Sequence, residues 1–448
     1  MASAILRLSL PVIAGMIIQV LYNLVDMFFI GMLADPAQVA AVNIVTPLFM
    51  SMMALATIVS TGAASYISRC LGQHDQENAG RTLSTGVVIT LGLSAAATLL
   101  GLLFAPSLVR LLGADEQIVP YAYSYAVALL VGSSIIMGNY TMGQLLRSEG
   151  ATTVSMIGMM IGTVVNIILD PVFIFALNMD ILGAAVATVI GNGCALAYYV
   201  WYYATNRSLV KFHLRLVSFT REIYWQIFSI GIPATISQLL VSVAIVVSNN
   251  LAKAYGVATV AGIGIASKVM TIGTFIFMGF AAGCQPLIGF SFGARNYPRV
   301  NAIIKTAMLM TTLLGVALMA LFKYQASTLI AVFAGKMDAV LEQGAMILRA
   351  LSWSLCALGP LMLANTSVQA LGKAKASLFL SFSRQGLFFL PLLFILNTKH
   401  GLAGLIHTQP LADGITTLVA LFVLASVIRK AEFGQPPSIA MSNQPLSQ

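Results

Sequence analysis

Long apolar runs alternate with short polar stretches along nearly the whole chain. Each run has about 20 residues or more, which is the length that an α-helix needs to cross the ~30 Å hydrocarbon core of a bilayer. The pattern predicts an all-α integral membrane protein with twelve spanning helices, at 8–33, 38–64, 84–106, 119–143, 155–177, 182–204, 223–251, 259–289, 301–324, 341–368, 376–396 and 402–427.

The composition agrees with this pattern. Of the 448 residues, 59% are hydrophobic and 8% are charged, whereas about 25% are charged in a soluble domain. Many predicted spans also contain Gly, Pro, Asn or Gln, which lipid tolerates only where neighbouring helices or a wet cavity satisfy the polar groups. We therefore expect a polar interior between the helices.

The second half of the chain repeats the first. Four segments recur in the same order at offsets between 220 and 225 residues: LSLPVIAGMI at 8–17 with IGIPATISQL at 230–239, GAASYISRCLG at 62–72 with GCQPLIGFSFG at 283–293, QLLRSEGAT at 144–152 with QALGKAKAS at 369–377, and LDPVFIF at 169–175 with FLPLLFI at 389–395. Six spans in each half give both halves the same orientation, so a pseudo-two-fold axis along the membrane normal should relate two six-helix lobes.

The repeat defines the expected domains. We predict an N-terminal lobe at 1–204, a basic cytoplasmic linker at 205–222, a C-terminal lobe at 223–430 and a polar cytoplasmic tail at 431–448. A cleft between two such lobes is the natural place for a substrate.

The net charge of +9 is distributed as the positive-inside rule requires, which argues against a nucleic-acid partner. Sixteen of the 23 Lys and Arg fall at the N-terminus, in even-numbered turns or in the tail: Arg7, Arg69, Arg81, Arg147, Arg207, Lys211, Arg215, Arg221, Arg295, Arg299, Lys305, Lys373, Lys375, Arg384, Arg429 and Lys430. This distribution predicts a multi-pass protein of the cell (inner) membrane with both termini in the cytoplasm.

Three acidic residues, Asp26, Asp170 and Asp413, lie inside predicted spans. An ionised Asp at the centre of a bilayer costs about 2.5–3.5 kcal/mol on insertion scales, so such a residue is usually functional. The alternative is a neutral Asp that joins helices by hydrogen bonds.

The surroundings of the first two acids favour function. Helical spacing places Gln19, Tyr22, Asn23 and Asp26 along one stripe, because residues three and four apart share a face. Asn166 and Asp170 are likewise four residues apart. Carboxylate, amide and hydroxyl oxygens suit a hard cation or a proton rather than a transition metal.

These segments resemble the multidrug and toxic compound extrusion (MATE) family. The resemblance rests on LSLP at a helix start, YNLVDMFFIG in the first span, NIILDPVFIF in the fifth and GAAVAT at the start of the sixth. It implies cation or proton coupling at Asp26, Asn166, Asp170 and Thr188, where Na⁺ could also bind, and a hinge at Pro11. It is closest to the DinF-like branch, because the acids that the NorM-like branch carries in helices 7 and 10 are missing.

The resemblance implies a secondary active antiporter and not an enzyme. Such a protein exports amphipathic, often cationic drugs in exchange for H⁺ or Na⁺, needs no other cofactor and works as a monomer in the bilayer. The residues expected at the substrate cleft are Gln19, Tyr22, Asn23, Met27 and Asp413. An ion pair of Asp413 with Lys268 or Arg349, which lie inside predicted spans, is an alternative for that acid.

Other functions fit the sequence less well. No zinc-binding spacing and no GxxxxGK[ST] loop occurs in the sequence, which leaves an ion gradient as the energy source. A flippase for lipids or lipid-linked precursors would share the two-lobe architecture but should line its cleft with several Arg or Lys. An intramembrane aspartyl protease and a channel lack their motifs. The residues leave the choice between H⁺ and Na⁺ open, with a lean to H⁺ because neighbouring carboxylates share a proton readily.

Overall fold

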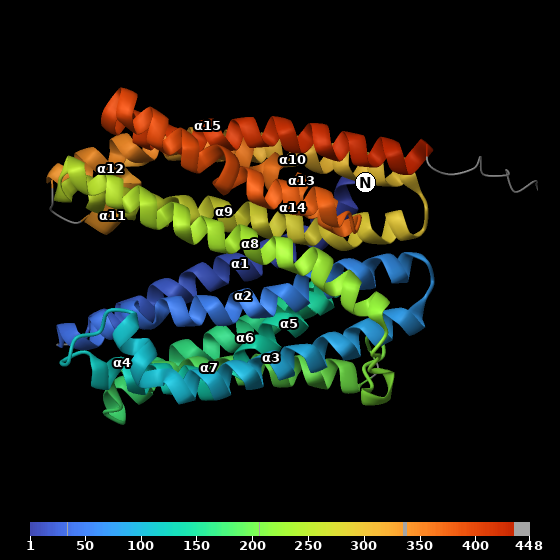
Figure 1. Ribbon diagram of the computed structural model, residues 1–448, viewed down its shortest axis with the longest axis horizontal. Coiled ribbons are helices and arrows are strands. Elements are labelled where there is room, and N and C mark those ends of the chain that lie inside the picture. Colours follow the sequence, from blue (N-terminus) through green and yellow to red (C-terminus); the bar gives the residue numbers. More distant parts are fainter. Residues whose placement is uncertain (34, 206, 335–337, 434–448) are drawn as a thin grey trace, which may run out of the picture.

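The structure, a computed structural model, describes residues 1–33, 35–205, 207–334 and 338–433. Helices from the first half of the chain lie together on one side of the molecule, and those from the second half lie on the other (Figure 1). The first half contains α1 Ala2–Gly31, α2 Pro36–Gly72, α3 Gln76–Leu111, α4 Val119–Val131, α5 Ser133–Ser148, α6 Thr152–Pro171, η1 Val172–Ala176 and α7 Asp180–Ala204.

The second half follows a linker that contains the single turn η2 Leu214–Leu216. Its helices are α8 Arg221–Ala252, η3 Lys253–Tyr255, α9 Val257–Gly293, α10 Tyr297–Tyr324, α11 Ala326–Ala334, α12 Asp338–Leu351, α13 Ser354–Ala370, α14 Ala374–Phe382, η4 Ser383–Phe389 and α15 Leu390–Phe433. No strand occurs among the described residues. The predicted tail at 431–448 lies outside them from residue 434 onward.

The helices account for twelve spans within the described ranges. Nine helical segments are long and apolar enough to cross a membrane, and two bent pairs, α4 with α5 (52°) and α12 with α13 (48°), add one span each. The segment Ala374–Ala431 has 58 residues, far more than the ~20 that one span needs. It breaks at Gly401, whose φ of 56° and ψ of −135° are not helical, and so supplies two spans.

The internal repeat is visible in the backbone. Residues with positive φ recur at separations of 221 or 222 residues, in the pairs His74 (59°) with Arg295 (55°), Gly150 (87°) with Gly372 (68°), and Asp180 (52°) with Gly401 (56°). Non-glycine residues adopt this conformation rarely. Corresponding turns in the two halves therefore have the same backbone conformation.

The two lobes meet through glycines in two interfaces that correspond under the repeat, α2 against α8 and α1 against α9. A Cβ at Gly62 would overlap the carbonyl of Ile227, and one at Gly231 would overlap that of Ile58. A Cβ at Gly283 of α9 would likewise overlap the backbone of α1. These contacts lie toward the end of the molecule that carries the N-terminus, so the lobes are closed there.

The linker lies against the N-terminal lobe. The backbone N–H of His213 donates to Ser84 Oγ (3.2 Å) and that of Ser218 to Thr85 Oγ1 (3.0 Å). Ser208 Oγ donates to one oxygen of Glu149, in the turn between α5 and α6. The other oxygen, Glu149 Oε1, is buried without a partner. Burial raises the pKa of this carboxyl from 4.5 to about 7, although the bond from Ser208 opposes the rise.

We expect this carboxyl to make stability depend on pH. Between about pH 4.5 and pH 7 the folded protein keeps a proton that the unfolded chain loses, so the free energy of unfolding falls as pH rises, by about 3 kcal/mol. Glu149→Gln should flatten this fall, measured as the thermal midpoint in detergent at pH 5 and pH 8. Glu116→Gln is the control, because that side chain is 84% exposed. Equal pH dependence in both variants would contradict the assignment.

Candidate functional site

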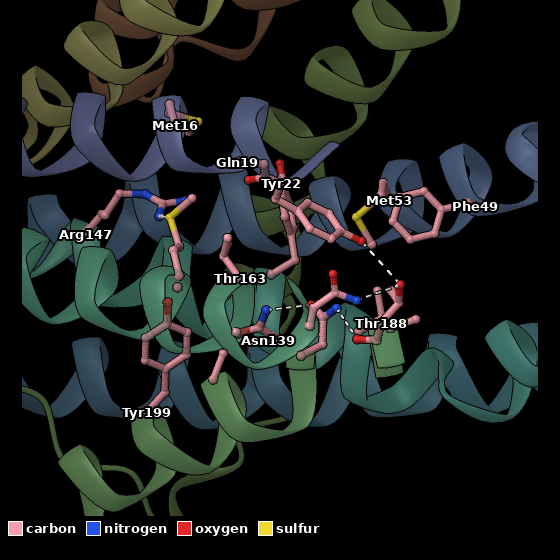
Figure 2. A pocket seen from close by; sticks show the side chains of 18 residues that line it. Met16, Gln19, Tyr22, Phe49, Met53, Asn139, Arg147, Thr163, Thr188 and Tyr199 are labelled. Atoms are coloured by element: carbon pink, nitrogen blue, oxygen red, sulfur yellow. Dashed lines mark hydrogen bonds between the residues drawn. The ribbon is translucent and has the colours of Figure 1, made fainter. Parts of the chain in front are cut away.

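A polar pocket of about 130 Å³ lies inside the N-terminal lobe. Side chains from α1, α2, α5, α6 and α7 line it, and Figure 2 shows them converging on one space. Met16, Met53 and Met159 supply thioethers, while amide, hydroxyl and phenol groups supply most of the polar lining. The pocket therefore combines adaptable apolar contacts with fixed hydrogen-bonding groups.

A cluster of oxygen ligands adjoins one end of the pocket, where Tyr22, Asn166 and Thr188 line it. Asn166 Nδ2 lies 3.3 Å from Asp170 Oδ1 and 3.5 Å from Thr188 Oγ1, and Tyr22 Oη lies 3.3 Å from the same hydroxyl. Asp170 and Asn166 are almost completely buried. Asp26 is close enough to Asp170 for the two carboxyl groups to interact electrostatically. The fold thus brings together the four residues Asp26, Asn166, Asp170 and Thr188.

Several oxygens in this cluster have no hydrogen-bond partner. They are Asp26 Oδ1, Asp170 Oδ2 and Asn166 Oδ1, joined nearby by Asn139 Oδ1. A buried acceptor left without a donor is costly, so each such atom calls for a proton, a cation or a ligand donor. No group of three His, Cys, Asp or Glu within the described ranges could hold a transition metal. The donor set fits a hard monovalent cation or a proton.

Local backbone features explain how the sequence builds this cluster. Pro171 ends α6, and the wide turn η1 follows it directly. Such π-helical turns are frequent at functional sites. Gly162 of α6 and Gly191 of α7 have no side chain, and a Cβ on Gly191 would lie 2.6 Å from the Gly162 carbonyl. This close approach places Asn166 beside Thr188.

A protein-family comparison decides the identity. The MatE family model matches residues 11–172 and 233–395, one match in each lobe, which together cover most of the chain. The chain belongs to the MATE family.

Relatives of known name and structure agree with this assignment. The chain is 29% identical over 421 residues to the multidrug export protein MepA of Staphylococcus aureus, covering 94% of this chain and 93% of that one. MepA of Staphylococcus haemolyticus is 27% identical, with 95% and 93% covered. The solved outward-facing conformation of a multidrug resistance MATE family transporter superposes with a TM-score of 0.91 at 28% identity, covering 96% of each chain. The predicted family and the two-lobe fold are confirmed; the DinF-like branch stays a prediction.

Of the other residues predicted in the first span of this MATE protein, some line the pocket and some are exposed. Gln19 and Tyr22 line the pocket. Asn23 is exposed, and Met27 is 52% exposed with its sulfur 3.6 Å from Lys268 Nζ, on α9 of the other lobe. Pro11 lies inside the continuous helix α1.

Asp413 lies in the C-terminal lobe and is fully buried, so it does not face an open cleft. Its carboxylate pairs with Arg384 of η4, with Nε 2.9 Å from Oδ1, and also accepts from Gln409 Nε2 (2.9 Å) and Ser354 Oγ. The alternative pairing with Lys268 or Arg349 is therefore wrong. The positive-inside pattern groups Arg384 with the cytoplasmic cations, whereas its side chain points into the lobe.

Sequence reasoning missed three groups of the MATE pocket. Asn139 Nδ2 donates to Asn192 Oδ1 (2.8 Å), and Asn192 Nδ2 donates to the Thr188 carbonyl (2.8 Å), which extends the polar network beyond the predicted residues. The sequence signal for these two residues is an Asn inside an apolar span, since such an amide needs a polar partner there. The positive-inside pattern also places Arg147 in a turn, but it lines the pocket and is only 5% exposed.

Proposed function

We propose that this MATE protein is a secondary active antiporter that exports amphipathic, often cationic compounds in exchange for H⁺ or Na⁺. The observation that carries the proposal is the set of unpartnered carboxylate and amide oxygens at Asp26, Asp170 and Asn166, beside a pocket with thioether and aromatic walls. The names of the MepA relatives, which describe multidrug export, support drugs as the cargo over the lipids of a flippase.

The chemistry of exchange follows from charge. Ionised carboxylates at this site attract a cationic substrate, because Coulomb interactions are strong away from bulk water. Arrival of H⁺ or Na⁺ neutralises the same oxygens and weakens the hold on the substrate. The substrate and the coupling ion thus compete for the same carboxylates. If the site opens to each side of the membrane in turn, this competition results in antiport. Gln19 and Tyr22 would contact the substrate, with Asn23 and Met27 further along α1.

Orientation in the membrane is part of the proposal. The positive-inside distribution supports cytoplasmic termini in the cell membrane. The lobes are packed together toward the N-terminal end, so this arrangement is closed to the cytoplasm. It would release substrate outward as a monomer.

Ethidium efflux tests the proposal. Inverted vesicles containing the purified chain should accumulate ethidium when a pH or Na⁺ gradient is imposed, and each gradient is applied separately at fixed membrane potential. Empty vesicles are the control. Indifference to both gradients would refute ion-coupled antiport.

Thr188→Val should separate the two coupling ions. Its hydroxyl can coordinate Na⁺ but has no useful acidity, so the change should reduce sodium-driven efflux about tenfold and leave proton-driven efflux within about twofold. The measurement is the initial rate of efflux under each gradient. Thr163→Val is the control, because Thr163 lines the same pocket without a hydrogen bond to the carboxylate cluster (Figure 2). Equal loss under both gradients would contradict a role specific to sodium.

Pro11→Ala should affect motion more than binding. Proline removes one backbone hydrogen bond within α1, which makes bending of that helix easier. MATE structures have been solved in a bent and a straight conformation, which supports a change of shape of this kind. We expect the turnover rate to fall several-fold, on the order of 1 kcal/mol, with the dissociation constant nearly unchanged. Equal turnover in variant and parent would remove the hinge.

A further inference from the structure

Among the residues that the structure describes, Arg147 is a buried cation with no acidic partner. It lies near the end of α5, lines the pocket and is 5% exposed. The ion pairs within the described part of the chain involve other residues, and its neighbour Glu149 is held by Ser208. An arginine that serves packing alone would reach water or pair with an acid, because burial of an uncompensated charge is costly.

The hydrogen bonds of Arg147 leave a donor free. Nε and Nη2 both donate to Gln144 Oε1 (3.0 and 2.7 Å), and Nη1 donates to Ser155 Oγ (2.6 Å). A guanidinium has five N–H groups, so one remains on each Nη. The remaining N–H of Nη1 donates only to the sulfur of Met159 at 4.0 Å, a weak acceptor, so the second N–H of Nη2 is the one without a hydrogen bond among the described residues. These neutral partners orient the guanidinium but do not neutralise it.

The pocket consequently has two unlike ends. Figure 2 shows Arg147 at one end and Thr188 at the other, with Asn139 and Thr163 between them. The guanidinium lies at the first end. The unpartnered oxygen of Asn166 lines the second end, and Asp170, which accepts from Asn166 Nδ2, lies next to it. The volume of about 130 Å³ is well below the roughly 300–1,000 Å³ of pockets that enclose a whole drug. The space suits a compact polar head of a larger molecule.

We infer that Arg147 forms an anion subsite that holds the carboxylate of zwitterionic amphipathic substrates, while their cationic part faces the acidic end of the pocket. The inference rests on the proposed function, because it assigns the pocket to substrate. A planar guanidinium with free N–H groups recognises a carboxylate by charge-assisted, directional hydrogen bonds. The acidic cluster selects the cation, and Arg147 adds selection for compounds that also carry an acid.

Two matched dyes test this subsite. Rhodamine B has a cationic ring system and a free carboxylate, and its ethyl ester masks the carboxylate. Binding to purified protein in lipid nanodiscs is measured by fluorescence polarisation without any ion gradient. The wild-type protein should bind rhodamine B about tenfold more tightly than the ester, as expected for one charge-assisted hydrogen-bonded pair.

Variants locate the effect. Arg147→Gln should weaken binding of rhodamine B about tenfold and change binding of the ester less than about twofold, and Arg147→Lys should keep part of the preference. Arg349→Gln, a change of an exposed arginine on α12, is the charge-matched control. The inference is overturned if the wild-type protein prefers the ester or binds neither dye, or if Arg147→Gln weakens both dyes equally, which would indicate packing alone.

The proposed antiport is tested separately from the subsite. Gradient-driven efflux of the ester should continue in Arg147→Gln, because the coupling carboxylates are intact. Loss of dye preference with efflux retained would support the subsite. Dye preference without any gradient-driven efflux would refute the antiport and leave the subsite supported.

Discussion

Asp170→Asn and Asp26→Asn are each expected to abolish ion-driven efflux while the protein still inserts in the membrane. The substitution preserves shape and removes both the charge and the exchangeable proton. Asp170 Oδ2 and Asp26 Oδ1 have no hydrogen-bond partner in the described structure, so an ion or proton is the group that they lack. Insertion of the variants in the membrane should not decrease, because an ionised Asp inside the bilayer costs about 2.5–3.5 kcal/mol and the substitution removes that cost.

The measurement is ethidium efflux in vesicles at equal protein density, with the pH and Na⁺ gradients imposed in turn. Asp115→Asn is the matched control, because Asp115 is exposed at the start of α4 and an amide oxygen can still accept from the N–H groups of Gln117 and Ile118. Transport at the parental rate by both pocket variants would defeat the assignment of the cation site.

Arg384→Met should strongly destabilise the C-terminal lobe. The change leaves the fully buried Asp413 without its counter-charge, and breaking a buried pair in this way costs about 3–5 kcal/mol. The double variant Arg384→Met with Asp413→Leu should regain most of the lost stability, because it buries two apolar side chains and leaves no unpaired charge.

Thermal unfolding in detergent measures both variants. Arg81→Met is the control, since the Arg81–Glu77 pair lies on the surface and should contribute less than about 1 kcal/mol. If Arg384→Met melted at the parental temperature, the buried pair would have no part in the stability of the lobe.

The twelve spans were predictable because lipid leaves the backbone few alternatives to a helix, so the length of each apolar run determines one span. The breaks inside spans were not predictable in the same way. Gly132 separates α4 from α5 without a proline, and the short helix α11 follows α10 with no strong boundary signal. Such features depend on packing between helices, which the periodicity of one segment does not contain.

The carboxylate site was predictable from residue type, whereas the two arginines were not. Asp26 and Asp170 are conspicuous because charge is rare in an apolar run. Arg147 lies close to a polar turn, where a cation normally faces water, and Arg384 lies inside the predicted span 376–396 with no acid near it in the sequence. Only the packed structure shows that one turns into a pocket and the other toward Asp413. The direction of a side chain near the end of a span is a tertiary property.

The glycine contacts between the lobes have a consequence for gating. The ion pairs within the described ranges lie within one lobe or the other. The contacts between lobes are main chain against main chain, hydroxyl to carbonyl, as for Ser9 and Phe280, or a charged group with a neutral partner, as for Arg69 and Gln226. Changes in ionic strength should therefore have little effect on the packing between the lobes, because no ion pair of the described residues lies there to be screened. Opening and closing would depend on steric fit and on what is bound inside the lobes, so the gate and the ion-sensing chemistry are physically separate parts of the molecule.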